Sequence, residues 1–328
     1  MAEPSVETAY ENARLIHKVL SLYYGADATQ SDIARRLGIS TPKVNRLLKM
    51  ARRQGMVRIS LHTPFQQLFD LEKQLEATFL IPEVVVLPSS AGDTQTSLSA
   101  LGAAGARYLL EHLRDGDVIA IGGGTTLHAI VEAVNPQRIY KVDVVPVVGG
   151  VQGRVTTDVN FLASQLAERL GGRAFQLHSP AFAESSQQRQ TLLNMKPIQD
   201  ILNIARRANI ALLGIGTVDP ETSRFVQFTA LSAEEMKQIA DLYHGIGELL
   251  AIIYDQAGKP CAQPYADRVV GLTIEELMAI PLRIGVAGSL SKAAAIHGAL
   301  SGRYLHTLIT DETAAQGVME IQAIPQGS

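Results

Sequence analysis

The chain has 328 residues, of which 46% are apolar, and its formal net charge is −3. This length suits two domains, and the apolar share is too high for a disordered protein. A single cysteine, Cys261, excludes a disulfide framework within the chain and fits a reducing compartment. The acidic N-terminus does not resemble a signal peptide, and no run approaches the roughly 20 apolar residues that span a bilayer. We therefore expect a cytoplasmic protein.

The charge is unevenly distributed along the chain. Residues 1–62 contain ten of the 29 Lys and Arg residues but only five of the 32 Asp and Glu residues, so their net charge is +5. The rest of the chain carries −8. A small basic segment on a larger acidic one predicts that a polyanion binds near one end of the chain.

Two short helices joined by a glycine turn are predicted in the basic segment, after a first helix over residues 12–24. Thr29 can cap the second helix, and Gly38 permits a sharp turn. Ser40 and Pro42 are suited to begin the third helix. This helix-turn-helix geometry places the third helix in the DNA major groove, with its first residues at base edges.

The residue types at the start of the third helix suit base recognition. Arginine pairs well with guanine and asparagine with adenine, and a glutamine at the start of the preceding helix suits a phosphate contact. Residues 55–59 resemble the first strand of a wing. The alternative is a solvated pair of basic helices in a small bundle. The predicted DNA-binding residues are Gln30, Thr41, Pro42, Lys43, Asn45 and Arg46.

Beyond residue 62 the pattern changes. Residues 65–79 predict a connecting helix, which could pack on the rest of the chain or on a partner. From residue 82 onward, short β-branched runs alternate with amphipathic helices, which is typical of a mostly parallel sheet covered on both faces. The predicted strands are 84–87, 118–121, 142–148, 210–215, 249–254, 282–286 and 305–310. The predicted helices are 98–113, 127–134, 159–170, 192–208, 233–242 and 292–300, and the pattern is loose after residue 315.

The expected fold class is therefore α/β. A winged helix-turn-helix domain over residues 1–62 precedes a connecting helix over 63–81 and a doubly wound effector domain over 82–328. Open sheets of this kind bind ligands at the carboxyl ends of their strands. The informative residues are therefore those that follow the predicted strands.

The first of these is the stretch "IGGGTTL", in which Gly122, Gly123, Gly124, Thr125 and Thr126 lie between a strand and a helix. Glycine backbone N–H groups, a helix N-terminus and two hydroxyls together favour a phosphate. The pattern is neither a Walker loop nor a dinucleotide fingerprint. The alternative is that the glycines only make a tight turn.

Other candidates follow later strands. Asn160 could cap a helix or point at a ligand, and Asp255 in "DQAGK" could be a turn residue or a hydroxyl acceptor. Lys292 could be a surface residue or could neutralise a phosphate. The predicted effector-binding residues beyond the Gly–Thr stretch are Gly149, Gly150, Asn160, Gly216, Asp255 and Lys292. We expect no metal ligands and no cofactor.

The motifs "TQSDIARRLGISTPKVNRLLKMARRQGMVRI", "IGGGTTL", "VVGGV", "GIG", "YDQAGK" and "VAGSLSKAAAI" occur in an order that resembles the SorC family of bacterial transcriptional regulators. The resemblance implies a winged helix-turn-helix joined to a domain related to sugar-phosphate isomerases. It also implies that a phosphorylated sugar or polyol changes the affinity of an oligomer, often a tetramer, for operator DNA.

Individual residues match the family's motifs. Gly122, Gly124, Thr125 and Thr126 match its phosphate loop, Asp255 matches an acid that resembles a sugar-hydroxyl acceptor, and Lys292 matches its lysine. Ser289 stands where a glycine is common, so the local backbone is expected to differ. Residues 179–185 also depart from the pattern, and we expect them to shape ligand preference.

We therefore expect a DNA-binding regulator of a carbohydrate or polyol catabolic operon, with repression relieved by the effector. The expected partners are double-stranded operator DNA, a phosphorylated effector and further copies in a homo-tetramer or dimer, with no membrane. One alternative is a sugar-phosphate isomerase-like enzyme, with candidates Glu184, Asp219, Asp255 and Lys292 that no compact motif orders. Another is a DNA-binding architectural protein with no small ligand, against which the phosphate loop argues.

Overall fold

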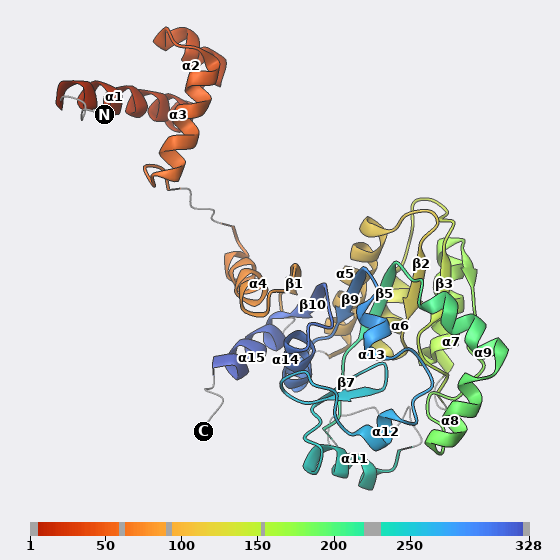
Figure 1. Ribbon diagram of the computed structural model, residues 1–328. Coiled ribbons are helices and arrows are strands. Elements are labelled where there is room, and N and C mark those ends of the chain that lie inside the picture. The colour runs from red at the N-terminus through yellow and green to blue at the C-terminus, as the bar shows by residue number, and fades with distance from the viewer. Residues whose placement is uncertain (1–5, 59–62, 90–93, 152–154, 220–230, 324–328) are drawn as a thin grey trace. The chain divides into compact units, whose positions relative to one another are not determined.

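The computed structural model describes residues 6–58, 63–89, 94–151, 155–219 and 231–323 (Figure 1). The chain divides into two compact units, residues 1–66 and residues 67–328. The described part of the smaller unit is helical, and the larger unit is built on a parallel sheet. The predicted α/β class with an N-terminal helix-turn-helix is confirmed.

The smaller unit encloses its own core. Its elements are α1 (Val6–Leu20), the π-helical turn η1 (Ser21–Gly25), α2 (Gln30–Leu37) and α3 (Thr41–Arg53). Val19, Ile33 and Val44, one from each α-helix, are fully buried against one another. The first helix begins at Val6 rather than near residue 12, and its last turn widens into η1.

The turn between α2 and α3 follows the sequence prediction with one difference. The Thr29 hydroxyl accepts the Asp32 N–H at 3.2 Å, and Gly38 adopts φ +65°, a conformation that favours glycine. Ser40 occupies the N-cap position of α3, but its side chain makes no capping hydrogen bond. The reason lies in its neighbours, because Pro42 has no N–H and the Lys43 N–H donates to the Ser40 carbonyl at 2.9 Å.

The predicted wing strand is not formed in the described residues. Gly55 lies in a turn with φ +69°, and residues 56–58 form no strand. Ile59, the last residue of the prediction, lies outside the described residues. The helix-turn-helix is therefore established by α2 and α3 alone.

The larger unit contains a seven-stranded, wholly parallel sheet in the order β1-β10-β9-β5-β2-β3-β4, and a three-stranded antiparallel sheet in the order β6-β7-β8. The strands are β1 (Glu83–Leu87), β2 (Val118–Ile121), β3 (Asp143–Pro146), β4 (Arg173–Ala174), β5 (Ile210–Gly214), β6 (Gly216–Thr217), β7 (Gly247–Leu249), β8 (Ile252–Tyr254), β9 (Leu282–Val286) and β10 (Thr307–Asp311). The α-helices are α4 (Gln66–Phe79), α5 (Thr94–His112), α6 (Thr125–Ala133), α7 (Val159–Leu170), α8 (Ser186–Leu193), α9 (Lys196–Ala205), α11 (Ala233–Asp241), α12 (Gln263–Ala266), α13 (Ile274–Met278), α14 (Ala293–Ser301) and α15 (Glu312–Ala323). Two 3₁₀ turns, η2 (Val155–Thr157) and η3 (Leu290–Lys292), precede α7 and α14.

Helices cover both faces of the large sheet (Figure 1). One apolar core joins the sheet to α5, α6 and α7, and a second joins it to α4, α9, α14, α15 and the small sheet. The strands are apolar on both sides because both faces are buried, as expected for a parallel sheet. This arrangement directs the carboxyl ends of the central strands to one edge of the sheet.

The connecting helix α4 packs on the larger unit. Leu68, Leu75 and Phe79 are buried in the second of these cores. The sequence left open whether this helix would contact the rest of the chain or a partner. The described contacts show that one apolar side of α4 is covered within the chain.

Three predictions differ from the structure by more than the ends of an element. The predicted strand 249–254 is the β7–β8 hairpin, because Leu250 and Ala251 adopt φ +56° and +64° and reverse the chain. The predicted helix 192–208 is two helices, α8 and α9, with Pro197 in the first turn of the second. The loosely patterned tail contains α15, a regular helix whose buried residues are mostly small.

Candidate functional site

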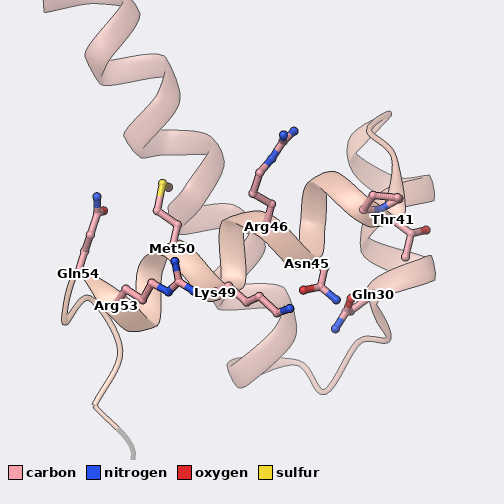
Figure 2. A pocket seen from close by; sticks show the side chains of 9 residues that line it. Gln30, Thr41, Asn45, Arg46, Lys49, Met50, Arg53 and Gln54 are labelled. Carbon is pink, nitrogen blue, oxygen red and sulfur yellow. The ribbon is translucent and has the colours of Figure 1, made fainter.

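A row of polar and basic side chains lies along α3. Thr41, Asn45, Lys49 and Arg53 are spaced four residues apart, so they share one side of the helix. Figure 2 shows this row. The row lines an open depression of about 860 Å³. The depression is lined by Gln30, Thr41, Pro42, Asn45, Arg46, Lys49, Met50, Arg53 and Gln54. None of these nine described residues is acidic, so the face suits a polyanion.

Five of the six predicted DNA-binding residues line this depression, and Lys43 is exposed but lies outside it. The sequence-based set missed Lys49, Met50, Arg53 and Gln54, although the helical spacing of Lys49 and Arg53 from Thr41 could have identified those two. Arg52 points elsewhere, since its guanidinium donates to the Tyr24 hydroxyl at 2.7 Å. That bond ties α3 to η1.

The larger unit has a cavity of about 330 Å³ at the carboxyl ends of β2, β5, β9 and β10. This position is where open parallel sheets bind ligands. Its polar lining residues are Ser97, Thr125, Thr126, Thr157, Thr217, Glu248, Ser289, Ser291, Lys292 and Asp311. Its apolar lining residues include Leu98, Leu101, Val148, Val151, Ala181, Phe182, Ile215, Leu250 and Ala251.

The Gly–Thr loop forms one wall of the cavity. Gly124 is the N-cap of α6 and adopts φ +113°, which side chains rarely tolerate. The first intrahelical hydrogen bond runs from the His128 N–H to the Gly124 carbonyl, so the N–H groups of residues 125–127 have no intrahelical acceptor. Thr126 is 7% exposed. The loop therefore offers backbone donors and hydroxyls to an anion in the cavity.

A lysine and a glutamate also line the cavity. Lys292 donates its Nζ to the Ile215 carbonyl at 2.8 Å, and Glu248 accepts the Ala251 N–H at 3.0 Å. Removal from water raises the pKa of Glu248, while the Ala251 N–H and the positive charge of Lys292 act in the opposite direction. A side chain at Gly216 would meet the Glu248 carboxylate, which would have to move.

Ser289 keeps a glycine-like conformation, with φ +80°. Its N–H donates to Asp311 Oδ2 at 2.7 Å, and Asp311 Oδ1 accepts the Ala314 N–H at 2.8 Å at the start of α15. Asp311 is itself buried. The Asp311 carboxylate at the end of β10 therefore holds two things in place: the strained Ser289 backbone in the cavity wall and the N-terminus of α15.

Seven of the predicted effector-binding residues line the cavity: Gly122, Gly123, Gly124, Thr125, Thr126, Gly216 and Lys292. The other four have structural positions. Asp255 accepts the N–H groups of Ala257 and Lys259 within its own turn, at 3.0 and 2.9 Å. Of its two possible roles, the structure supports the turn residue.

Asn160 and the Gly149–Gly150 pair also lie outside the cavity lining. Asn160 pairs through its side-chain amide with the Leu177 backbone, and Asp158 rather than Asn160 caps α7. A side chain at Gly149 would collide with the Pro180 carbonyl. These residues maintain contacts between chain segments beside the cavity.

The sequence prediction missed Glu248. A single carboxylate inside the apolar run "GIGELLAII" was the available signal, since buried charges need a partner or a function. Among the candidates for the enzyme alternative, Glu184 and Asp219 are exposed and line no part of the cavity. Within the described residues, no cluster of three or more His, Cys, Asp or Glu is arranged to hold a metal ion. None of the helices described there is both long and apolar enough to cross a membrane.

Comparison with known proteins covers nearly the whole chain. A family model described as "Putative sugar-binding domain" matches residues 63–320, and a model for "Sigma-70, region 4" matches residues 17–54. The deoxyribonucleoside regulator of Bacillus subtilis is 30% identical over 94% of this chain and 98% of its own length. The sorbitol operon regulator of Klebsiella pneumoniae is 30% identical over 93% of this chain and 98% of its own length. The crystal structure of the full-length Klebsiella protein superposes with a TM-score of 0.72 at 29% identity, over 94% of this chain and 99% of that chain.

Proposed function

This chain belongs to the SorC family of sugar-binding transcriptional regulators, and on that premise we propose that a phosphorylated sugar or polyol in the cavity controls operator binding by α2 and α3. One observation carries the proposal. A single chain combines a basic face free of acidic lining residues with a cavity whose glycine loop, hydroxyls and lysine suit a phosphate. DNA binding is assigned to residues 1–62, the connection to residues 63–81 and effector binding to residues 82–328.

On DNA, the roles divide by residue type. Arg46 and Asn45 contact base edges in the major groove, while Lys49, Arg53 and Gln30 contact phosphates. Lys43 stays in the proposed set as a phosphate contact beside the depression. Because phosphate contacts release counterions, operator affinity falls steeply with salt.

In the cavity, the phosphate lies against the Gly122–Thr126 loop, with Lys292 as the countercharge. Glu248 accepts a hydroxyl of the effector, and the apolar wall that includes Leu101 and Phe182 faces its carbon skeleton. A volume of about 330 Å³ is at the small end of ligand pockets, which suits a monosaccharide-sized ligand. Two of the relatives are named for the regulation of deoxyribonucleoside and sorbitol genes, which supports the same class.

The effector relieves repression, and the protein acts in the cytoplasm as a homo-tetramer or dimer. Catalysis is not part of the proposal, because the relatives are transcriptional regulators and, of the four candidates, Lys292 alone lines the cavity. Glu248 and Lys292 do place an acid and a base in one cavity, so the enzyme alternative needs a direct test.

The test uses sorbitol phosphate, deoxyribose phosphate, erythritol phosphate and glucose phosphate. At least one is expected to raise the melting temperature, because a ligand that binds only the folded protein stabilises it. The same compound is expected to weaken binding to DNA from the regulator's own promoter in fluorescence anisotropy, and to be recovered unchanged. If no phosphosugar alters DNA affinity, the proposal fails, and catalytic conversion would favour the enzyme.

A further inference from the structure

Two glutamates of α4 bind the edge strand of the large sheet. Glu76 Oε1 accepts the Val84 N–H at 3.1 Å, and Glu72 Oε1 accepts the Val86 N–H at 2.9 Å. Among the described residues, β1 has a strand neighbour on one side only, β10. Along β1 the N–H groups alternate in direction, so Glu83 donates towards β10 while Val84 and Val86 face outward. The carboxylates satisfy outward donors that an edge strand otherwise presents to solvent or to another chain.

The helix and the strand have matching repeats. Residues four apart on a helix are separated by about 6 Å along its axis. Residues two apart on a strand are separated by about 6.6 Å. Glu72 and Glu76 therefore reach Val86 and Val84 at the same time, and this double contact fixes both the position of α4 along β1 and its direction.

The same strand is joined to the ligand cavity. β1 pairs with β10 in a register that runs from Glu83 opposite Thr307 to Leu87 opposite Asp311. The Tyr108 hydroxyl bonds both residues of the first pair, at 2.5 Å to Glu83 and 2.9 Å to Thr307. At the other end of the β1–β10 pairing, the Asp311 carboxylate accepts the Ser289 N–H in the cavity wall.

We propose that Glu72 and Glu76 are positioning residues that transmit effector binding from the cavity, through β10 and β1, to the helix that leads to the DNA-binding unit. The inference rests on the proposed function, because it needs an effector in the cavity and DNA on α3. The effector contacts the wall formed by Ser289 and Lys292 and thereby reduces the mobility of Asp311 and β10. As a result, the hydrogen bonds between α4 and β1 are formed more of the time. Without effector the two carboxylates lose their hydrogen bonds to β1 more often, and α4 is more mobile.

The contact between α4 and β1 can be released because the Glu72 carboxylate is held at a cost in free energy. Burial raises the pKa of Glu72, and this effect outweighs the opposing effect of its hydrogen bond to Val86. The negative charges of Glu76 and Glu83 raise it further. The bonded arrangement and the water-exposed one are therefore alternatives that a ligand can shift if it favours one of them.

The first test replaces both glutamates with methionine, which keeps the side-chain length and removes the acceptor. We expect E72M/E76M to bind the promoter and the phosphosugar with wild-type affinities but to lose the effect of one on the other. Coupling between sites typically changes affinity by about 5- to 150-fold, and in this variant the ratio of DNA affinities without and with effector is expected to approach one. E72Q/E76Q, which retains two acceptor oxygens, should recover part of the response. Gln74→Met, on the exposed side of the same helix, should behave as wild type.

The second test measures hydrogen exchange at the Val84 and Val86 amides directly. In the wild-type protein the effector should slow exchange at Val84 and Val86 more than at β4, the opposite edge of the sheet. In E72M/E76M both amides should exchange faster, with or without effector. A full DNA response in E72M/E76M, or equal slowing at β1 and β4, would overturn this inference and leave the proposed function standing. If none of the four phosphosugars changes the DNA affinity of the wild-type protein, that result instead overturns the proposed function.

Discussion

Replacing Lys292 with methionine should separate effector binding from DNA binding. The Lys292 Nζ donates to the Ile215 carbonyl in the cavity wall, and its position suits a second bond to a phosphate oxygen. A hydrogen bond to a charged group contributes about 1.5–3 kcal/mol. Since each 1.4 kcal/mol is a factor of ten, effector affinity should fall by about 10- to 150-fold.

The folded protein should lose some stability as well. Without Lys292 the Ile215 carbonyl lacks this donor, and Glu248 lacks the positive charge that lowers its pKa. An unmade hydrogen bond of a buried group costs about 1–3 kcal/mol, which urea unfolding can measure. DNA affinity without effector should not change, because α3 belongs to the other unit.

The assay is calorimetric titration of Lys292→Met with the phosphosugar that stabilises the wild-type protein most. Lys237→Met is the matched control, since Lys237 is exposed on α11 and lines no part of the cavity. Unchanged effector affinity in Lys292→Met would refute the assignment of this lysine to the phosphate.

Four further predictions concern single residues. Arg46→Ala should abolish operator binding in anisotropy and leave effector affinity unchanged in calorimetry, because Arg46 lies on the basic face. Thr126→Val should leave operator binding intact but weaken the effector by about 2- to 10-fold in the same titration, the value of one neutral hydrogen bond, and an unchanged response would exclude this loop as the phosphate site. Ala251→Gly should raise the free energy of unfolding by up to about 1 kcal/mol in urea, since φ +64° strains alanine but not glycine. Because the folded-state pKa of Glu248 is raised, its favourable contribution is present below the unfolded pKa of 4.5 and is lost as pH rises through the folded pKa. Glu248→Gln should therefore gain stability relative to wild type at neutral pH, and this gain should shrink towards pH 4 in thermal melts.

The sequence predicted the helix-turn-helix well because its signals are local. Thr29, Gly38 and Pro42 act within a few residues of their own positions, and each is found where its chemistry suggested. The sheet was also predictable, since β-branched runs separated by amphipathic helices have few other solutions. The β7–β8 hairpin was not, because a Leu–Ala turn with two positive φ values contradicts ordinary turn propensities.

The ligand cavity was predicted less completely for a related reason. The Gly–Thr loop is contiguous in sequence, so its residues were found together. Glu248 and Asp311 reach the cavity from distant strands, and their positions depend on the strand order, which sequence patterns do not give. Asp255 lies outside the cavity lining and accepts N–H groups of its own turn, and the sequence could not decide between these roles because an aspartate after a strand fits a turn and a ligand site equally well.

The contact between α4 and β1 also bears on where the larger unit begins. A shortened chain that starts at Pro82 keeps every strand of the sheet but lacks the helix that covers Val84 and Val86. It would expose the two backbone N–H groups of Val84 and Val86, and also the part of the apolar core that Leu75 and Phe79 cover. Such a surface can pair with strands of neighbouring molecules, so we expect the larger unit to fold properly only when α4 is present.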